Sequence, residues 1–348
     1  MRLPMKNEKV DDELATPLLQ RAVDLGINFF DSHWFYCNYD SQRAVGEALR
    51  GIRDKVYIST KLAMWLVEKP EHFDEYLDKA LDQLGLDYLD FYHFPYLSYK
   101  TWTDHILPFK LVDRAEKAKS KGLIRHLSFS FHSDPDKMPE LIDTGAFSTV
   151  LGQYNLVDRT NEEFFAYAHD KGVGTMVMVP LLGGVLTDGG SAFMERMEAD
   201  KLECKPASAA EMALRFVWSL PSVDMVLSGM SNIQQLEENV AIASAKTMSQ
   251  SDREALIKRS DSINSLNDLF CTTCNYCHEC PLDIKIGWIF QLYNQHNVWG
   301  LTDAVRSRVE ASLDPTACTA CGMCVKRCPQ KIDIPNELKR VWPVLKNL

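Results

Sequence analysis

Residues 1–230 alternate between two kinds of segment, and this alternation limits the folds open to the chain. Apolar runs of about six residues, rich in β-branched and aromatic side chains, are each followed by a longer amphipathic stretch. Such an alternation is typical of parallel strands joined by helical crossovers. The predicted strands cover residues 26–31, 56–61, 88–94, 125–130, 149–154, 174–179 and 224–229.

Amphipathic helices fit between these strands, over residues 71–84, 110–121, 162–171 and 208–218. In the last of them Ser208 is followed three positions later by Glu211, which is a capping-box pattern. Eight βα units close a TIM barrel whose active site lies at the C-terminal ends of its strands. We therefore predict an α/β fold, a (β/α)8 TIM barrel, with the first strand apparently truncated because seven strands follow Met1.

The composition favours a globular protein and excludes several classes. The 348 residues suit one large barrel and a small appendage, and hydrophobic and charged residues make up 46% and 25% of them. A net charge of −10 opposes nucleic-acid binding, which requires a basic face. No apolar run approaches the roughly 18 residues of a membrane helix, and "MRLPMKNEKV" does not resemble a signal peptide. We expect a cytoplasmic protein with neither membrane nor nucleic-acid partners.

Eight of the ten cysteines form two tight runs, "CTTCNYCHECP" (271–281) and "CTACGMCVKRCP" (318–329). In a reducing compartment such runs indicate metal binding rather than disulfides. Both contain C-x2-C-x2-C, which allows one short loop to place three thiolates around an iron–sulfur cubane. Zinc is the alternative, although zinc sites normally use separated pairs of cysteines. Cys37 and Cys204 stand apart from the runs and are predicted to be structural thiols.

The two runs also suggest where the chain divides. We predict a barrel over residues 1–260 and a small, mostly helical domain over residues 261–348, because "IGWIFQLYNQ" and "TDAVRSRVEA" between the runs look helical.

Each run ends in a cysteine followed by proline, and in this respect it resembles the bacterial two-cluster ferredoxins. In those proteins the last cysteine of each run ligates the other cluster. The resemblance implies a ferredoxin-like domain with two 4Fe–4S clusters, one held by Cys271, Cys274, Cys277 and Cys328, the other by Cys318, Cys321, Cys324 and Cys280. The first run has x2 rather than x3 before its last cysteine, so Cys280 fits the crossed pattern less well.

Three further stretches resemble the aldo/keto reductases, which are NADP(H)-linked (β/α)8 barrels. "GINFFDSHWFY" is similar to the family pattern G-x-N-x-x-D-T-A-x-x-Y, and "ISTK" to the strand that carries its catalytic lysine. "VLSGMSNIQQLEENV" is similar to the terminal cofactor loop and helix. With the cysteine runs, the chain resembles the iron–sulfur subgroup of this family. The resemblance begins at "MRLP", where the family's first strand is ending, so the family's N-terminal hairpin is expected to be missing.

The resemblance assigns catalytic roles to polar residues at the predicted strand ends. Tyr36 corresponds to the general acid that protonates the carbonyl oxygen, with Lys61 beside it and Asp31 anchoring the lysine. The roles are chemically sensible, because a neighbouring ammonium favours the phenolate and lowers a tyrosine pKa that is ordinarily near 10. His93 and His132 also follow apolar runs and are expected near the same mouth.

The same resemblance implies a nucleotide site. NADP(H) is the expected cofactor, with NAD(H) as the alternative, and a flavin is left open. Gln153 and Asn155 would lie near the nicotinamide. The residues implied near the adenine and the phosphates are Ser228, Gly229, Ser231, Asn232, Gln235, Glu238 and Asn239.

One family residue is replaced. Where the family has a histidine after its fourth strand, in a context such as "DFYLLH", this chain reads "DFYHFP" and places Pro95 there. His93 lies two residues earlier, on the same strand face but about 7 Å deeper. His33 could supply the missing group, or it could line the pocket while His93 is a core histidine.

These features favour an NADP(H)-dependent oxidoreductase acting on a carbonyl or related unsaturated small molecule, with two clusters that exchange electrons with a ferredoxin or another electron-transfer partner. The alternative is a nucleotide-binding redox sensor or electron carrier with little carbonyl reductase activity, which Pro95 favours. A third reading is that the clusters only stabilise the fold.

Overall fold

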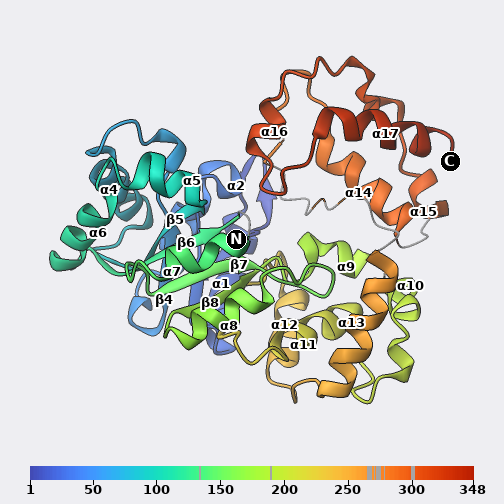
Figure 1. Ribbon diagram of the computed structural model, residues 1–348, viewed down its shortest axis with the longest axis horizontal. Coiled ribbons are helices and arrows are strands. Elements are labelled where there is room, and N and C mark those ends of the chain that lie inside the picture. The colour runs from blue at the N-terminus through green and yellow to red at the C-terminus, as the bar shows by residue number, and fades with distance from the viewer. Residues whose placement is uncertain are drawn as a thin grey trace. The chain divides into compact units, whose positions relative to one another are not determined.

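The computed structural model describes residues 1–132, 135–188, 190–264, 269, 271, 276–277, 279–298 and 302–348 (Figure 1). The chain forms two compact units. Unit 1 contains Met1–Tyr154, Thr160–Met178 and Pro221–Ala245, and unit 2 contains Asn155–Arg159, Val179–Leu220 and Lys246–Leu348. A domain boundary between residues 260 and 261 stays a prediction.

Unit 1 is built on a parallel sheet of seven strands, which confirms the strands predicted from the alternation. Their order in the sheet follows the sequence from β3 to β9. The strands are β3 (Phe29–Asp31), β4 (Tyr57–Lys61), β5 (Leu89–Leu97), β6 (Ile124–Phe131), β7 (Thr149–Gln153), β8 (Gly174–Met178) and β9 (Met225–Val226).

The sheet is a half-barrel. Within the described residues, β3 pairs only with β4 and β9 only with β8, so the two outer strands do not close the sheet. The segment before α1 forms a separate antiparallel hairpin of β1 (Met5–Lys6) and β2 (Lys9–Val10). This hairpin follows "MRLP" in the sequence, so it is not the family's N-terminal hairpin, and the expectation that the latter is missing stays a prediction.

Parallel pairing brings the polar strand ends together. Asp31 is the register partner of Ser59, and Lys61 is the partner of His93. Because all seven strands run in the same direction, these residues lie toward the same, C-terminal end of the sheet.

The helices of unit 1 have apolar faces that pack in its interior. In α4 (His72–Leu84), Phe73, Leu77 and Leu81 are buried at helical spacing, and Gly85 ends the helix with φ 63°. Figure 1 shows α4 next to α6. The other helices are α1 (Asp12–Asp24), α2 (Tyr36–Tyr39), α3 (Ser41–Ala48), α5 (Tyr99–Thr101), α6 (Leu111–Ser120), α7 (Met138–Ile142), α8 (Glu162–Asp170) and α12 (Ile233–Ala243).

A buried carboxylate organises the opposite end of the sheet. Asp90, near the start of β5, is 1% exposed and accepts a hydrogen bond of 2.8 Å from the Ile58 amide. It also pairs with Arg53 at 2.6 Å and with Arg125 at 3.1 Å. Both guanidinium groups lie over the ring of Tyr88. The charge of Asp90 is therefore compensated on two sides.

Unit 2 is helical in its described residues. Ser208 caps α11 by accepting a hydrogen bond from the Glu211 amide, and Glu211 accepts one from the Ala207 amide, so the predicted cap is confirmed. "TDAVRSRVEA" gives only a short helix that ends at Arg306. The helices are α9 (Val185–Asp188), α10 (Gly190–Arg196), α11 (Ala209–Trp218), α13 (Gln250–Asn264), α14 (Ile286–Asn297), α15 (Thr302–Arg306), α16 (Met323–Arg327) and α17 (Ile334–Lys346).

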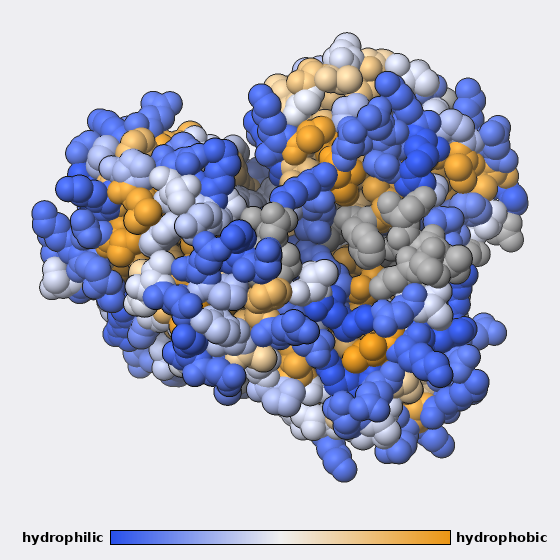
Figure 2. All heavy atoms as spheres, in the orientation of Figure 1, coloured by the Kyte–Doolittle hydropathy of each residue, from blue (hydrophilic) through white to orange (hydrophobic). Residues whose placement is uncertain are grey.

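The surface in Figure 2 is largely hydrophilic, and its hydrophobic residues are scattered in small areas. Among the described residues, none of the helices combines the length and the apolar character that crossing a membrane requires.

Candidate functional site

The centre of the candidate site is a buried ion pair in unit 1. The Nζ atom of Lys61 lies 2.5 Å from Asp31 Oδ2 and donates a second hydrogen bond of 3.1 Å to the Ser32 carbonyl. Ser59 donates to Asp31 Oδ1 at 2.8 Å. Asp31 and Lys61 are 8% and 4% exposed. Each charge is therefore held by several hydrogen bonds rather than by water.

The two charges tune each other. Burial is the largest influence on Asp31 and opposes its ionisation, but Lys61 together with weaker nearby charges outweighs it, so the pKa of Asp31 lies below its ordinary value. Burial lowers the pKa of Lys61, and the Asp31 carboxylate only partly offsets this effect. We infer a charged pair at neutral pH, since the 2.5 Å contact favours the ionised form of both groups.

Tyr36 lies beside this pair, as predicted. The Nζ atom of Lys61 is 5.2 Å from the centre of the Tyr36 ring. Tyr36 begins α2, and the next three residues, Cys37, Asn38 and Tyr39, have φ values of 54°, 52° and 67°. Consecutive non-glycine residues in the left-handed region are strained, and such strain is concentrated at functional sites.

His33 lies within the same cluster and is 1% exposed. Its Nδ1 atom accepts a hydrogen bond of 3.3 Å from the Phe35 amide, so the neutral ring carries its proton on Nε2. Burial, followed by the Lys61 ammonium, holds the pKa of His33 well below its ordinary value. Its ring lies 5.2 Å from that of Tyr36. Within the described part of the chain, His33 Nε2 has no hydrogen-bond partner.

His93 has the character of a core residue. It is fully buried in β5, and burial together with the Lys61 ammonium lowers the pKa of His93 to about 3. A neutral imidazole at this position adds no charge to the site.

A bulge follows His93 in β5. The register with β6 shifts between Phe94 and Leu97, and Tyr96 has φ 51°. Pro95 has no N–H to donate to the sheet, and the Tyr96 amide donates instead to Ser130 Oγ at 3.1 Å.

The bulge determines which aromatic ring reaches the site. The Tyr96 ring lies 6.3 Å from His33 and 4.9 Å from His132. Burial and the Lys61 ammonium lower the pKa of His132 to about 3. Tyr96 therefore directly follows Pro95, which occupies the position of the family's histidine.

An aromatic stack adds two residues that sequence reasoning missed, Trp65 and Tyr96. The rings of Phe35 and Trp65 stack with 3.6 Å between their centres, and Trp65 also stacks on His33 at 5.5 Å. Trp65 is 40% exposed despite these contacts. Its position shortly after Lys61 at the end of a predicted strand could have indicated a place at the mouth.

The predicted nucleotide loop joins β9 to α12. Asn232 caps α12 by accepting from the Gln235 amide at 2.9 Å, and Gln235 Oε1 accepts from the Ser231 amide at 2.9 Å. Asn239 donates to Ser228 Oγ at 3.1 Å. These bonds draw the loop and the first turns of the helix together. The amides of a helix N-terminus can bind an anion.

The two residues predicted near the nicotinamide belong to different units. Gln153 ends β7 and is 7% exposed, and its carbonyl accepts a 2.9 Å hydrogen bond from Asn161. Asn155, in unit 2, donates to the Val179 carbonyl and accepts from the Asp158 amide at 2.9 Å. Its side chain therefore holds a turn, and a role for either residue at the nicotinamide stays a prediction.

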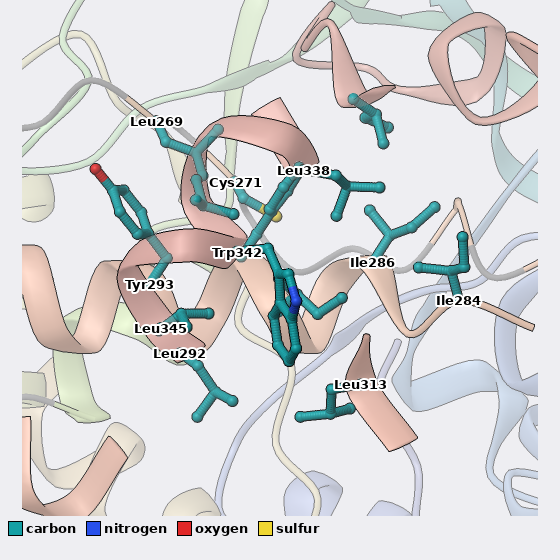
Figure 3. Close-up of a cluster of buried hydrophobic side chains, with 14 of the residues drawn as sticks. Leu269, Cys271, Ile284, Ile286, Leu292, Tyr293, Leu313, Leu338, Trp342 and Leu345 are labelled. Carbon is teal, nitrogen blue, oxygen red and sulfur yellow. The ribbon is translucent and has the colours of Figure 1, made fainter. Parts of the chain in front are cut away.

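Cysteines of both runs adjoin one hydrophobic core in unit 2. Figure 3 shows Cys271 among Leu269, Leu338 and Trp342, and Cys271 is 8% exposed. Cys274 lies outside the described residues, and Cys321 is exposed. The thiols packed against the same core are those of Cys277, Cys280, Cys318, Cys324 and Cys328.

This environment fits an iron–sulfur cluster. Clusters are held by cysteine thiolates, and apolar surroundings tune their potentials. Within the described ranges, no three or more His, Cys, Asp and Glu side chains are already arranged around a metal position. The fit therefore rests on the chemistry of the thiols and on their shared core. Burial raises the pKa of Cys204 to about 11 and also raises the pKa of Cys37 and of Cys324, so this shift does not distinguish the two lone thiols from a thiol of the runs.

Comparison with known proteins identifies the larger part of the chain. Residues 1–259 match the model of the aldo/keto reductase family. The chain belongs to the aldo/keto reductase family. Residues 270–332 of this aldo/keto reductase match a 4Fe-4S dicluster domain. Together the two matches confirm the resemblance to the iron–sulfur subgroup.

Relatives of this aldo/keto reductase include several oxidoreductases. An uncharacterized oxidoreductase, YqkF of Bacillus subtilis, is 26% identical over 70% of this chain and 86% of its own length. L-galactose dehydrogenase of Arabidopsis thaliana is 28% identical over 71% of this chain and 82% of its own length. The NADH-specific methylglyoxal reductase of Escherichia coli is 26% identical, over 74% and 90%. This aldo/keto reductase is accordingly an NAD(P)H-dependent oxidoreductase.

Solved structures agree on the fold. The holo form of aldo-keto reductase AKR11C1 from Bacillus halodurans aligns with a TM-score of 0.62 at 24% identity, over 74% of this chain and 91% of that one. An aldo/keto reductase from Klebsiella pneumoniae, in complex with NADP and acetate, aligns with a TM-score of 0.59 at 21% identity, over 71% and 85%.

Proposed function

We propose that the chain is an NADP(H)-dependent reductase of carbonyl or related unsaturated compounds. The observation that carries this proposal is the buried pair of Asp31 and Lys61, with Nζ of Lys61 5.2 Å from the centre of the Tyr36 ring. A fixed ammonium next to a phenol favours loss of the phenolic proton, which a carbonyl reduction requires.

Each residue of the cluster has a defined task. The nicotinamide, when bound, supplies the hydride. Tyr36 gives its proton to the substrate oxygen, Lys61 stabilises the phenolate that remains, and Asp31 holds Lys61 in place. His33 donates a hydrogen bond from Nε2 to the same oxygen and replaces the group lost at Pro95. His93 stays neutral in the core.

The nucleotide is assigned to the loop and helix after β9 and to the end of β7. NADP(H) is preferred because the Klebsiella pneumoniae structure holds NADP. NAD(H) is the alternative, because the Escherichia coli relative is named as NADH-specific. Gln153 and Asn155 are assigned to the nicotinamide, and the adenine and phosphates to Ser228, Gly229, Ser231, Asn232, Gln235, Glu238 and Asn239.

Two 4Fe–4S clusters complete the proposal, with the ligands divided between the runs as in ferredoxins. The match to a dicluster domain supports this number. One cluster is assigned to Cys271, Cys274, Cys277 and Cys328, and the other to Cys280, Cys318, Cys321 and Cys324. This many cysteines that serve as metal ligands rather than forming disulfides suits a reducing compartment, so we place the protein in the cytoplasm.

A ferredoxin or similar acidic electron-transfer protein is the proposed partner. Cys321 is exposed, and Met323 beside it is 41% exposed. Lys326 follows in α16 and is also exposed, whereas the exposed Arg327 next to it pairs with Glu279. Cationic side chains next to a cluster ligand would attract an acidic surface.

A redox sensor with little reductase activity is the second candidate. Pro95 favours it, because proline has no side-chain group that could polarise a carbonyl at the family histidine's position.

Replacing Tyr36 by Phe separates these functions. In the reductase, Tyr36→Phe lowers turnover by a factor of about 10² to 10⁴ and leaves the Kd for NADPH nearly unchanged. Turnover is measured on aldehydes, ketones, quinones and enones, and NADPH binding by calorimetry. Tyr39→Phe, at a tyrosine 51% exposed in the same short helix, is the control and should keep full turnover. A wild-type protein that binds NADPH but reduces none of these compounds would contradict the reductase and favour the sensor.

A further inference from the structure

Arg2 lies directly on the nucleotide loop of unit 1. A Cβ atom added to Gly229 would lie 3.0 Å from Arg2 Cγ and 3.2 Å from both Cβ and Cδ of Arg2. The aliphatic stem of the arginine therefore covers the position that any other residue at 229 would fill.

This contact gives Gly229 a specific task. Gly229 does not have the positive φ that would by itself require glycine. Its lack of a side chain instead makes room for Arg2. Both residues are exposed at the surface of unit 1.

The loop needs a cation from elsewhere in the chain. Residues 227–239 contain no Lys, Arg or His, and their charged members are Glu237 and Glu238. Arg21 pairs with Glu237 at 2.9 Å. A nucleotide phosphate at this loop would meet the amide groups at the start of α12 and, from Arg2, a guanidinium.

We propose that Arg2 binds a phosphate group of the dinucleotide, seated on Gly229. This inference rests on the assignment of the nucleotide to the β9–α12 loop and adds a residue from the opposite end of the sequence. A guanidinium binds phosphate with paired, charge-assisted hydrogen bonds. Two groups of the dinucleotide offer this chemistry, the 2′-phosphate of NADPH and the diphosphate that NADPH and NADH have in common.

Calorimetry with the full-length protein tests this role. Arg2→Ala should raise the Kd for NADPH by about 10-fold or more, and Arg2→Lys should restore part of the loss, because a charged hydrogen bond is removed and then partly replaced. If Arg2→Ala loses affinity for NADPH alone, Arg2 binds the 2′-phosphate. If it loses affinity for NADPH and NADH equally, Arg2 binds the diphosphate. Lys6→Ala removes the same charge at an exposed site in β1 and should leave both Kd values unchanged.

Gly229→Ala provides a second test, because its added methyl group should displace the Arg2 stem. It should weaken NADPH binding in the wild type and have little further effect in Arg2→Ala. Equal losses in both backgrounds would overturn the seating of Arg2 on Gly229. Unchanged affinities in Arg2→Ala would overturn the phosphate contact while leaving the proposed reductase intact. A wild type that binds neither dinucleotide would overturn both, whereas unaltered turnover in Tyr36→Phe would count against the reductase alone.

Discussion

Lys61 and Asp31 form a salt bridge of 2.5 Å in which both side chains are almost completely buried. The pair sits at the ends of two adjacent parallel strands, β4 and β3. The free energy of such a pair is dominated by the cost of leaving either charge without its partner, rather than by the attraction itself.

A double-mutant cycle should reveal this dependence. Asp31→Asn and Lys61→Met are each expected to lower the free energy of unfolding by about 3–5 kcal/mol, because each leaves one buried charge unpaired. The double variant should lose much less than the sum, as measured by urea unfolding. The matched control is the exposed pair of Lys137 and Glu140, whose coupling should stay below about 1 kcal/mol. Additive losses at Asp31 and Lys61 would contradict the pairing.

The buried histidines predict a pH dependence of stability. The pKa of His93 is about 3 in the fold and about 6.5 in the unfolded chain, so the unfolded state binds the extra proton between these values. Stability should therefore fall as the pH falls from 6.5 toward 3. His93→Gln should reduce the slope near pH 5 by about 1.4 kcal/mol per pH unit. Unfolding at several pH values measures the slope, and the exposed His105→Gln should leave it unchanged.

The carboxylate of Asp90 should be a large contributor to the stability of unit 1. Asp90→Asn removes the charge shared by Arg53 and Arg125, both of which keep some contact with water, so the free energy of unfolding should fall by about 1.5–3 kcal/mol, the usual contribution of a hydrogen bond to a charged group. Asp87→Asn, at an exposed position just before β5, should change it by less than about 0.5 kcal/mol. Thermal unfolding of the two variants decides the matter, and equal midpoints would refute the role given to Asp90.

Close packing of α3 against α4 should make Gly46 intolerant of substitution. A Cβ atom there would lie 2.0 Å from the Leu84 carbonyl oxygen. Gly46→Ala should destabilise the protein by about 1–3 kcal/mol or more, because backbone has to move apart. Glu47→Ala, at the exposed neighbouring position, should cost no more than a surface ion pair. A fully stable Gly46→Ala protein would show that the two helices are farther apart.

Iron content should distinguish the two cysteine runs from the lone thiols. After anaerobic reconstitution the wild type should hold about eight iron and eight sulfide per chain. Cys277→Ser should lose about half of each and keep NADPH binding, while Cys204→Ser should lose none, because Cys204 lies outside both runs. Iron, sulfide and zinc are measured on the same samples. Stoichiometric zinc without sulfide would contradict the clusters.

The sequence predicted the strands well because both faces of a parallel sheet are buried, which leaves continuous apolar runs. The strand at 224–229 was predicted too long. Its observed part, Met225–Val226, pairs with β8 alone, so fewer hydrogen bonds hold its end. The helix in "TDAVRSRVEA" was also predicted too long. The Arg308 and Val309 amides both donate hydrogen bonds to the Val305 carbonyl, and the helix ends there.

The places of Asp31 and Lys61 in the site were predictable, because each is a charged residue at the end of a predicted strand. The contribution of Tyr96 was not, because its orientation depends on a bulge stabilised by Ser130, a residue of another strand. The stacking of Trp65 on Phe35 joins two loops that sequence periodicity does not connect. Interactions of this kind depend on tertiary structure and leave no local pattern.

The interleaved make-up of unit 1 has a consequence for its synthesis. β9 and α12 lie in the stretch Pro221–Ala245, and Val179–Leu220, which belongs to unit 2, is translated before them. At roughly 5–20 residues per second, the ribosome needs several seconds to deliver residues 179–245. During that interval β8 has no partner on one side, and such an edge is a target for chaperones and for mispairing. The length of a segment of unit 2 thus sets how long β8 waits for its pairing with β9.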